Sequence, residues 1–139
     1  MWRFPYPAHD TMPKTMKTVT ISHTTKTYPK HSYQTVKDDI LGKTYELSLV
    51  FIGSTRAQQL NISTRGKDYI PNVLSFPYDQ KAGEIFICPT AAKREASKFD
   101  LTYNQYVLYL FIHGLLHLKG LDHGDKMDKA EIKYLKRYT

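Results

Sequence analysis

The sequence predicts a single α/β domain, more closely an α+β fold in which helices pack against a small mixed β-sheet. Its 139 residues suffice for one hydrophobic core and are too few for two. Some short stretches alternate apolar and polar residues or are continuously apolar, as strands are. Between them lie longer stretches with the periodicity of helices. No internal repeat and no linker between domains interrupts the chain. These observations predict one domain over residues 17–139.

The composition is that of a soluble globular protein, with 41% hydrophobic and 24% charged residues. Residues 1–16 contain three prolines and few aliphatic side chains, and we expect a disordered extension or a segment upstream of the true start. The longest apolar run near residue 110 is too short to span a bilayer. The single cysteine, Cys88, lies in an apolar run and excludes an internal disulfide, which favours a reducing, cytoplasmic location.

Two strands and two helices are expected in the first half of the domain. Residues 17–23 alternate apolar and polar side chains, which is typical of a short strand. A helix is predicted over 32–41, and residues 45–52 are apolar enough for a central strand. A short helix over 54–61 should follow, and then a loop that carries Arg65.

A pair of strands is predicted next, over residues 73–76 and 84–88. Between them we expect a turn that contains Pro77, Asp79 and Gly83, because proline, aspartate and glycine favour turns.

Helices are predicted for the rest of the chain. A helix over 91–97 precedes a long helix that starts at Asp100 or Thr102 and ends near Gly120, a natural helix stop. A basic amphipathic helix over 126–137 ends the chain. Its expected buried residues are Met127, Ile132 and Leu135.

The functional prediction depends on the stretch FIHGLLHLKGLDH, residues 111–123, which holds three histidines. His113 and His117 are four residues apart, so a helix presents both imidazoles on one face. A chain reversal at Gly120 can return His123 towards them. Three imidazole nitrogens with a fourth position left open are the ligand set of a catalytic zinc site. The alternative is that the histidines pack incidentally.

The spacing HxxxHxxGxxH is also that of the metzincin metalloproteases. Those enzymes carry a glutamate after the first histidine as the general base for peptide hydrolysis. Here that position is Gly114. A degenerate metzincin-like hydrolase therefore stays open only as an alternative.

The same residues carry a family resemblance. HGLLHLKGLDH resembles one signature of the bacterial YbeY family, and LNISTRGKDYIPNVLSFP, residues 60–77, resembles the other. GEIFIC, residues 83–88, resembles the strand that follows, and the resemblance extends from about Lys17 to the last helix. It implies a single-strand-specific, metal-dependent endoribonuclease that acts at the 3′ end of 16S ribosomal RNA and in ribosome maturation and quality control. The implied partners are ribosomal RNA and the small ribosomal subunit, and no membrane partner is implied.

The resemblance also implies roles for residues of the site. The three histidines would bind one Zn²⁺ or another divalent transition metal, and a metal-bound water would be the nucleophile. Arg65 matches the basic residue near the metal in the family, where a guanidinium can stabilise charge on the phosphate. Arg56 and Lys67 would attract RNA to the surface. Asp122 could hydrogen-bond a ligand imidazole or cap the turn.

Charge and departures from the family leave alternatives open. A net charge of +7 favours a polyanion partner such as RNA, but a solvated basic surface would have the same charge. The family commonly has Thr-Asp before VLSFP, and this chain has Pro71-Asn72, which removes a carboxylate. A non-catalytic ribosome-assembly factor with a structural metal is the main alternative.

Overall fold

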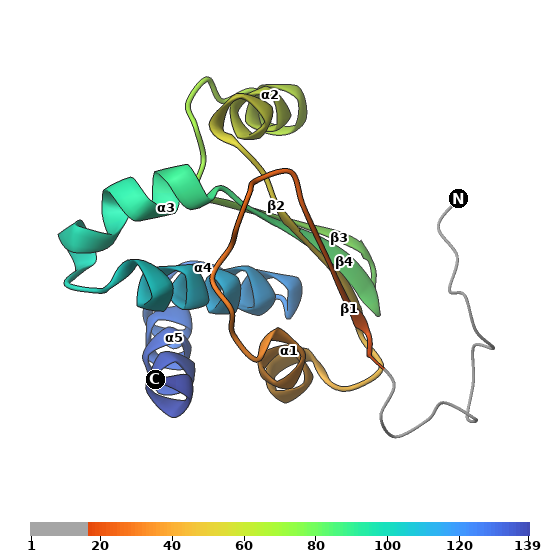
Figure 1. Ribbon diagram of the computed structural model, residues 1–139. Coiled ribbons are helices and arrows are strands. Elements are labelled where there is room, and N and C mark those ends of the chain that lie inside the picture. Colours follow the sequence, from red (N-terminus) through yellow and green to blue (C-terminus); the bar gives the residue numbers. More distant parts are fainter. Residues whose placement is uncertain (1–16) are drawn as a thin grey trace.

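A computed structural model describes residues 17–139 as a four-stranded sheet packed by helices (Figure 1). Residues 1–16, where an extension or an upstream segment was expected, lie outside the described residues. The elements in chain order are β1 (Val19–His23), α1 (Tyr33–Leu41), β2 (Glu46–Phe51), α2 (Ser54–Arg65), β3 (Val73–Asp79), β4 (Ala82–Ile87), α3 (Pro89–Glu95), the 3₁₀ helix η1 (Ala96–Phe99), α4 (Tyr103–Leu118) and α5 (Asp125–Tyr138).

The sheet is mixed, as the sequence predicts. Its strand order is β1-β2-β4-β3, with β1, β2 and β4 parallel and β3 antiparallel to β4. Helix α1 connects the parallel strands β1 and β2, which lie side by side. Strand β3 is an edge strand, and this position matters for the site described below.

Helices cover both faces of the sheet. The main core joins β2 and β4 to α1, α4 and α5, and includes the fully buried Leu49, Ile85 and Phe111. A smaller cluster on the other face packs α2 and the start of α3 around Ala57 and Cys88. Figure 1 shows α2 on the opposite side of the sheet from α1 and α4. No helix within residues 17–139 combines the length and apolar character needed to cross a membrane.

The hairpin of β3 and β4 differs from the prediction. Pro77 lies inside β3 and Gly83 inside β4, so the turn is confined to residues 79–82. Proline donates no backbone hydrogen bond, but an edge strand tolerates it because one side of the strand needs no donor. The pairing also shifts register between Pro77 and Asp79. The predicted turn, which included Pro77 and Gly83, was therefore too long.

The buried face of α5 is also rotated from the predicted one. Met127 is buried as expected, but the Ile132 side chain is 66% exposed and the prediction for it was wrong. Glu131 and Tyr134 take the buried positions instead. The helix thus buries a carboxylate where an aliphatic residue was expected.

Helix α4 approaches strand β4 closely at Gly114. A Cβ atom at position 114 would lie 3.0 Å from Cδ1 of Ile85, which is fully buried. Contacts that short require the neighbour to move. Glycine is thus the residue that lets the helix lie this close to the sheet.

We expect Gly114→Ala to lower the free energy of unfolding by about 1 kcal/mol. Overpacking costs about 1–3 kcal/mol, and the better helix propensity of alanine returns about 1 kcal/mol. Ile85→Val removes the atom in closest contact, so the cost of Gly114→Ala should be smaller in that background. Denaturant unfolding of both single variants and the double variant measures this coupling. Strictly additive effects would contradict the close contact.

Candidate metal centre

Helix α4 presents two of the three histidines, and both of its ends are well defined. At the first turn, the Thr102 hydroxyl accepts a hydrogen bond from the Gln105 backbone N–H, and the Gln105 side chain accepts one from the Thr102 N–H. This capping box fixes where the helix begins. His113 and His117 then fall one turn apart near its C-terminal end.

The end of α4 reverses the chain through a Schellman motif. The N–H of Gly120 donates to the His117 carbonyl at 2.9 Å, and the N–H of Leu121 donates to the Leu116 carbonyl at 3.0 Å. Gly120 has a φ of +104°, which side chains rarely allow, so glycine is needed there. The reversal carries the following loop, with His123, back over the helix end.

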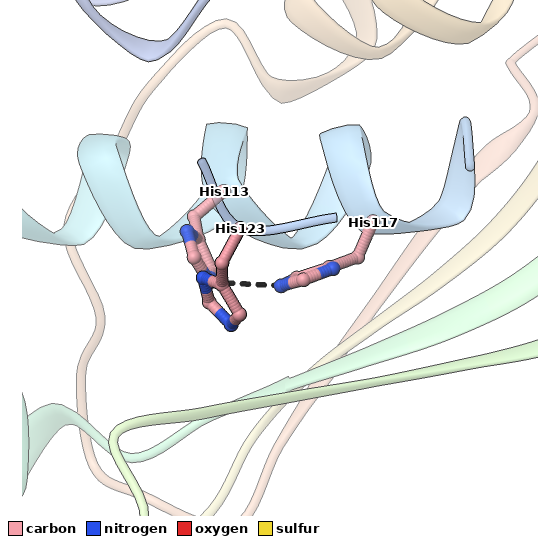
Figure 2. Close-up of side chains that lie close together, drawn as sticks. All are labelled: His113, His117 and His123. Carbon is pink, nitrogen blue, oxygen red and sulfur yellow. Dashed lines mark hydrogen bonds between the residues drawn. The ribbon is translucent and has the colours of Figure 1, made fainter. Parts of the chain in front are cut away.

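The three imidazoles converge. One ligand atom from each of His113, His117 and His123 lies within 4.8 Å of the others. The ring centroids of His113 and His117 are 4.6 Å apart, and that of His123 is 5.4 Å and 4.9 Å from them. Figure 2 shows the rings of α4 and of the loop pointing toward one another. The three histidines could therefore hold one metal ion.

Hydrogen bonds set the tautomers of the two helical histidines. His113 Nδ1 contacts a Glu131 carboxylate oxygen, and His117 Nδ1 lies 3.2 Å from the Leu121 carbonyl oxygen. Both oxygens accept, so each Nδ1 carries a proton, and the neutral form of each ring then has its lone pair on Nε2. The sequence thus folds so that both imidazoles offer their Nε2 atoms.

These two Nε2 atoms are 3.1 Å apart. A hydrogen bond between two ring nitrogens needs one proton between them, and a metal cation bound by both nitrogens would take the place of that proton. Two nitrogens that bind one zinc ion at about 2.0–2.1 Å in a tetrahedral arrangement lie about 3.3 Å apart. The observed separation fits such an ion, and the donor set fits zinc or a similar borderline metal.

The charge state of His117 also suits a ligand. Burial lowers its pKa below the usual value, and the nearby His113 and His123 lower it further. Only neutral imidazole binds a metal, so a lowered pKa reduces competition from protons.

Arg65 shares a pocket with the histidines. The pocket has a volume of about 410 Å³. Its lining residues are Arg65, Tyr69, Pro71, Asn72, Val73, Leu74, Ser75, Phe76, His113, Gly114, His117 and His123. Residues that are consecutive in a strand point to opposite faces of the sheet. Because the run from Pro71 to Phe76 lines the pocket without gaps, the pocket lies along the free edge of β3.

Arg65 is the last residue of α2, where the sequence predicted a loop. The helix continues past Asn61 and ends because Gly66 adopts a left-handed conformation, with a φ of +67°. One guanidinium nitrogen of Arg65 donates to the Asn61 amide oxygen at 3.3 Å and to the Tyr69 hydroxyl at 3.4 Å. Asn61 is fully buried and in turn donates to the Tyr69 carbonyl at 3.1 Å. The arginine therefore lies at the end of a helix, and two hydrogen bonds orient its guanidinium.

The other predicted site residues lie at the surface. Asp122 is exposed, and its charge acts on His117 by favouring the protonated form. Arg56 and Lys67 are exposed on and just after α2, outside the pocket lining.

Sequence reasoning missed two polar groups of the site. Glu131 on α5 contacts His113, and the sequence signal for it was a carboxylate at helical spacing between Met127 and Tyr134. Asn61 orients Arg65, and no pattern distinguishes it from the other polar residues of α2.

Asn72, which lines the pocket just before β3, has a carboxylate as its neighbour. Its amide nitrogen donates to Glu95 at 2.8 Å and to the Tyr106 hydroxyl at 3.2 Å. The Tyr106 hydroxyl donates to the same Glu95 oxygen at 3.1 Å. The three side chains connect the pocket wall to α3 and α4.

A family model described as Endoribonuclease YbeY matches residues 11–138 of this chain. The chain belongs to the YbeY family. The match confirms the family resemblance that the two sequence signatures indicated, and it includes the three histidines and Arg65.

Curated YbeY proteins are similar to this chain over part of their length. Endoribonuclease YbeY of Bdellovibrio bacteriovorus is 44% identical over 80 residues, which cover 56% of this chain and 53% of that protein. Endoribonuclease YbeY of Thiobacillus denitrificans is 35% identical over 103 residues, which cover 67% and 70%. The aligned part of this chain thus spans between about half and 70% of these relatives.

A solved structure has a similar fold. The solution structure of TM1509 from Thermotoga maritima superimposes with a TM-score of 0.62 at 25% identity, over 86% of this chain and 88% of that one. The mixed sheet with its helices is therefore an arrangement found by experiment in a similar protein.

Proposed function

We propose that this YbeY-family chain is a metal-dependent endoribonuclease that cleaves single-stranded RNA. One observation carries the proposal: three convergent imidazoles and an oriented arginine line the same pocket of about 410 Å³. The name of the curated relatives, Endoribonuclease YbeY, supports the reaction class.

His113, His117 and His123 would hold the metal, for which zinc is our proposal because three neutral imidazoles suit it. A bound metal of this kind supplies a nucleophile at neutral pH and polarises a phosphoryl oxygen. The residues around it keep the ligands in place. Hydrogen bonds from the two Nδ1 atoms hold the rings of the helical histidines, so both Nε2 atoms stay directed into the pocket.

Arg65 would bind the phosphate that is attacked. Its guanidinium stays charged and can donate two parallel hydrogen bonds, which suits the extra negative charge of a phosphoryl transition state. The contacts to Asn61 and Tyr69 use one of its terminal nitrogens, which leaves the other terminal nitrogen for the substrate.

The free edge of β3 favours an extended, unpaired strand as substrate. The pocket follows residues 71–76 between that edge and α4, and an edge strand offers unpaired backbone N–H and C=O groups. A flexible single strand can lie in such a groove, whereas a duplex would first have to open. Peptide hydrolysis is disfavoured, because position 114 is a glycine and has no carboxylate to act as the general base.

Ribosomal RNA of the small subunit, in the cytoplasm, is the substrate we propose. The net charge of +7 supports a large polyanionic partner. Exposed Arg56 and Lys67, close in sequence to Arg65, would add attraction for the RNA on either side of the cut. Asp122 would add negative charge beside the ligand His117 and so favour a bound cation.

Cleavage of an unstructured RNA by the purified, zinc-loaded protein tests the proposal. We expect cutting of the single strand, little cutting of a matched duplex, and no cutting after metal removal by a chelator. Circular dichroism should show that the chelated protein keeps its fold, because the ligands lie at a pocket and outside the main core.

Two outcomes would contradict the proposal. A folded, zinc-loaded protein that cuts neither free RNA nor RNA within small ribosomal subunits would favour a non-catalytic assembly factor. Unfolding by the chelator would show that the metal is structural.

A further inference from the structure

Glu131 is a buried carboxylate on the inner face of the amphipathic helix α5. The residue is only 6% exposed, and it lies between Met127 and Tyr134 on the buried face of α5. A buried carboxylate is costly unless hydrogen bonds compensate it, so its partners reveal what the position is used for.

Both partners of Glu131 come from α4. One carboxylate oxygen contacts His113 Nδ1, and the other accepts a hydrogen bond from the Tyr109 hydroxyl at 3.2 Å. Tyr109 and His113 are one turn apart on the same face of the helix. Burial and the nearby Glu131 raise the pKa of Tyr109 to about 12, so the hydroxyl is protonated and donates at neutral pH.

This arrangement links the packing of α4 and α5 to the orientation of the His113 imidazole. The contact with Glu131 fixes His113 in the tautomer whose Nε2 faces His117. The Tyr109 hydrogen bond keeps the carboxylate from rotating away. Helix α5 therefore contributes no ligand and yet determines how one ligand is presented.

We propose that Glu131 is a positioning residue of the metal centre and that metal binding and the docking of α5 stabilise each other through it. The inference rests on the metal site of the proposed function. Coupling between two equilibria is reciprocal, so a carboxylate that favours metal binding must make the metal favour the docked helix. Neither effect is expected of an acid that merely fills a buried position.

Substitution of Glu131 separates these cases. Loss of an outer partner of a ligand histidine typically weakens metal binding about 10–100-fold, and we expect Glu131→Ala to fall in this range. Glu131→Gln keeps the size and one acceptor oxygen, so its loss should be smaller. Tyr109→Phe keeps the packing and removes only the second hydrogen bond, and a loss of a few-fold is expected. Asp128→Asn, an exposed acid one turn earlier on α5, is the matched control and should bind zinc like the parent protein.

The experiment is a zinc titration of the full chain against a chromophoric chelator at fixed pH. Amide hydrogen exchange of α5 is measured with and without zinc, and ¹⁵N NMR of the imidazoles reports the tautomer. We expect zinc to slow exchange in α5 of the parent protein, and the effect to shrink in Glu131→Ala. The His113 ring should lose its single tautomer in that variant. If Glu131→Ala does not fold, Glu131→Gln and Tyr109→Phe still test the inference, because both should bind zinc more weakly than the parent protein.

The inference would be overturned if the folded Glu131 and Tyr109 variants bound zinc as tightly as the parent protein and if hydrogen exchange in α5 did not change. This failure is distinct from failure of the proposed function. If zinc binds with the expected dependence on Glu131 but RNA is not cut, the inference stands and the nuclease proposal fails. If RNA is cut and zinc affinity does not depend on Glu131, the nuclease proposal stands and the inference fails.

Discussion

His117→Ala is expected to abolish RNA cleavage and to weaken zinc binding by more than the loss of any outer partner. Removing an outer partner costs about 10–100-fold in metal affinity, and removing a ligand itself must cost more. His117 also has the Nε2 atom that lies 3.1 Å from that of His113, so its loss removes this close nitrogen pair. Zinc titration and cleavage of an unstructured RNA measure the two effects on one preparation.

The control for this variant is His23→Ala. His23 is an exposed histidine at the end of β1, outside the pocket lining, so its removal should leave zinc binding and cleavage unchanged. Alanine suits a helix, so His117→Ala should keep the fold. A folded His117→Ala protein that still binds zinc as tightly as the parent would remove the basis of the metal centre.

Arg65→Ala should lower kcat/KM for RNA cleavage about 10²–10³-fold, the range found when a donor to a developing anion is removed. Zinc affinity should not change, because Arg65 contacts Asn61 and Tyr69 and no histidine. Arg65→Lys keeps the charge but loses the parallel pair of hydrogen bonds, so it should recover only part of the rate. Steady-state kinetics beside a zinc titration separate chemistry from metal binding.

Arg94→Ala removes the same charge from an exposed position on α3 and is the matched control, with little change expected. Equal losses in the Arg65 and Arg94 variants would mean that only net charge matters. In that case the arginine in the pocket would have no role of its own.

Much of the fold could be predicted from local signals. Alternation identified β1 and Gly120 marked the end of α4; of the two starts predicted for α4, Asp100 and Thr102, the structure has Thr102 as the cap. These features depend on residues that are close in sequence. The family signatures contain the histidines and Arg65 together, although the sequence alone could not show that they line one pocket.

What could not be predicted depends on contacts between distant segments. The buried face of α5 includes Glu131 in place of Ile132, and only packing against α4 explains why an acid is buried there. Pro77 was assigned to a turn because proline disfavours strands, and only its edge position makes the strand acceptable. The helix continues to Arg65, and the buried Asn61 inside it bonds to the Tyr69 carbonyl, a contact that local propensity does not reveal.

The three histidines lie within one short stretch of chain, from His113 to His123, and this has a consequence for how the protein folds. Closing a short loop costs little entropy, so the ligand set can assemble as soon as α4 and its reversal form. Arg65 and Glu131 must be brought in by contacts between segments far apart in sequence, which form more slowly. The three ligands that we propose therefore depend on local chain closure, whereas the rest of the pocket depends on packing between distant segments.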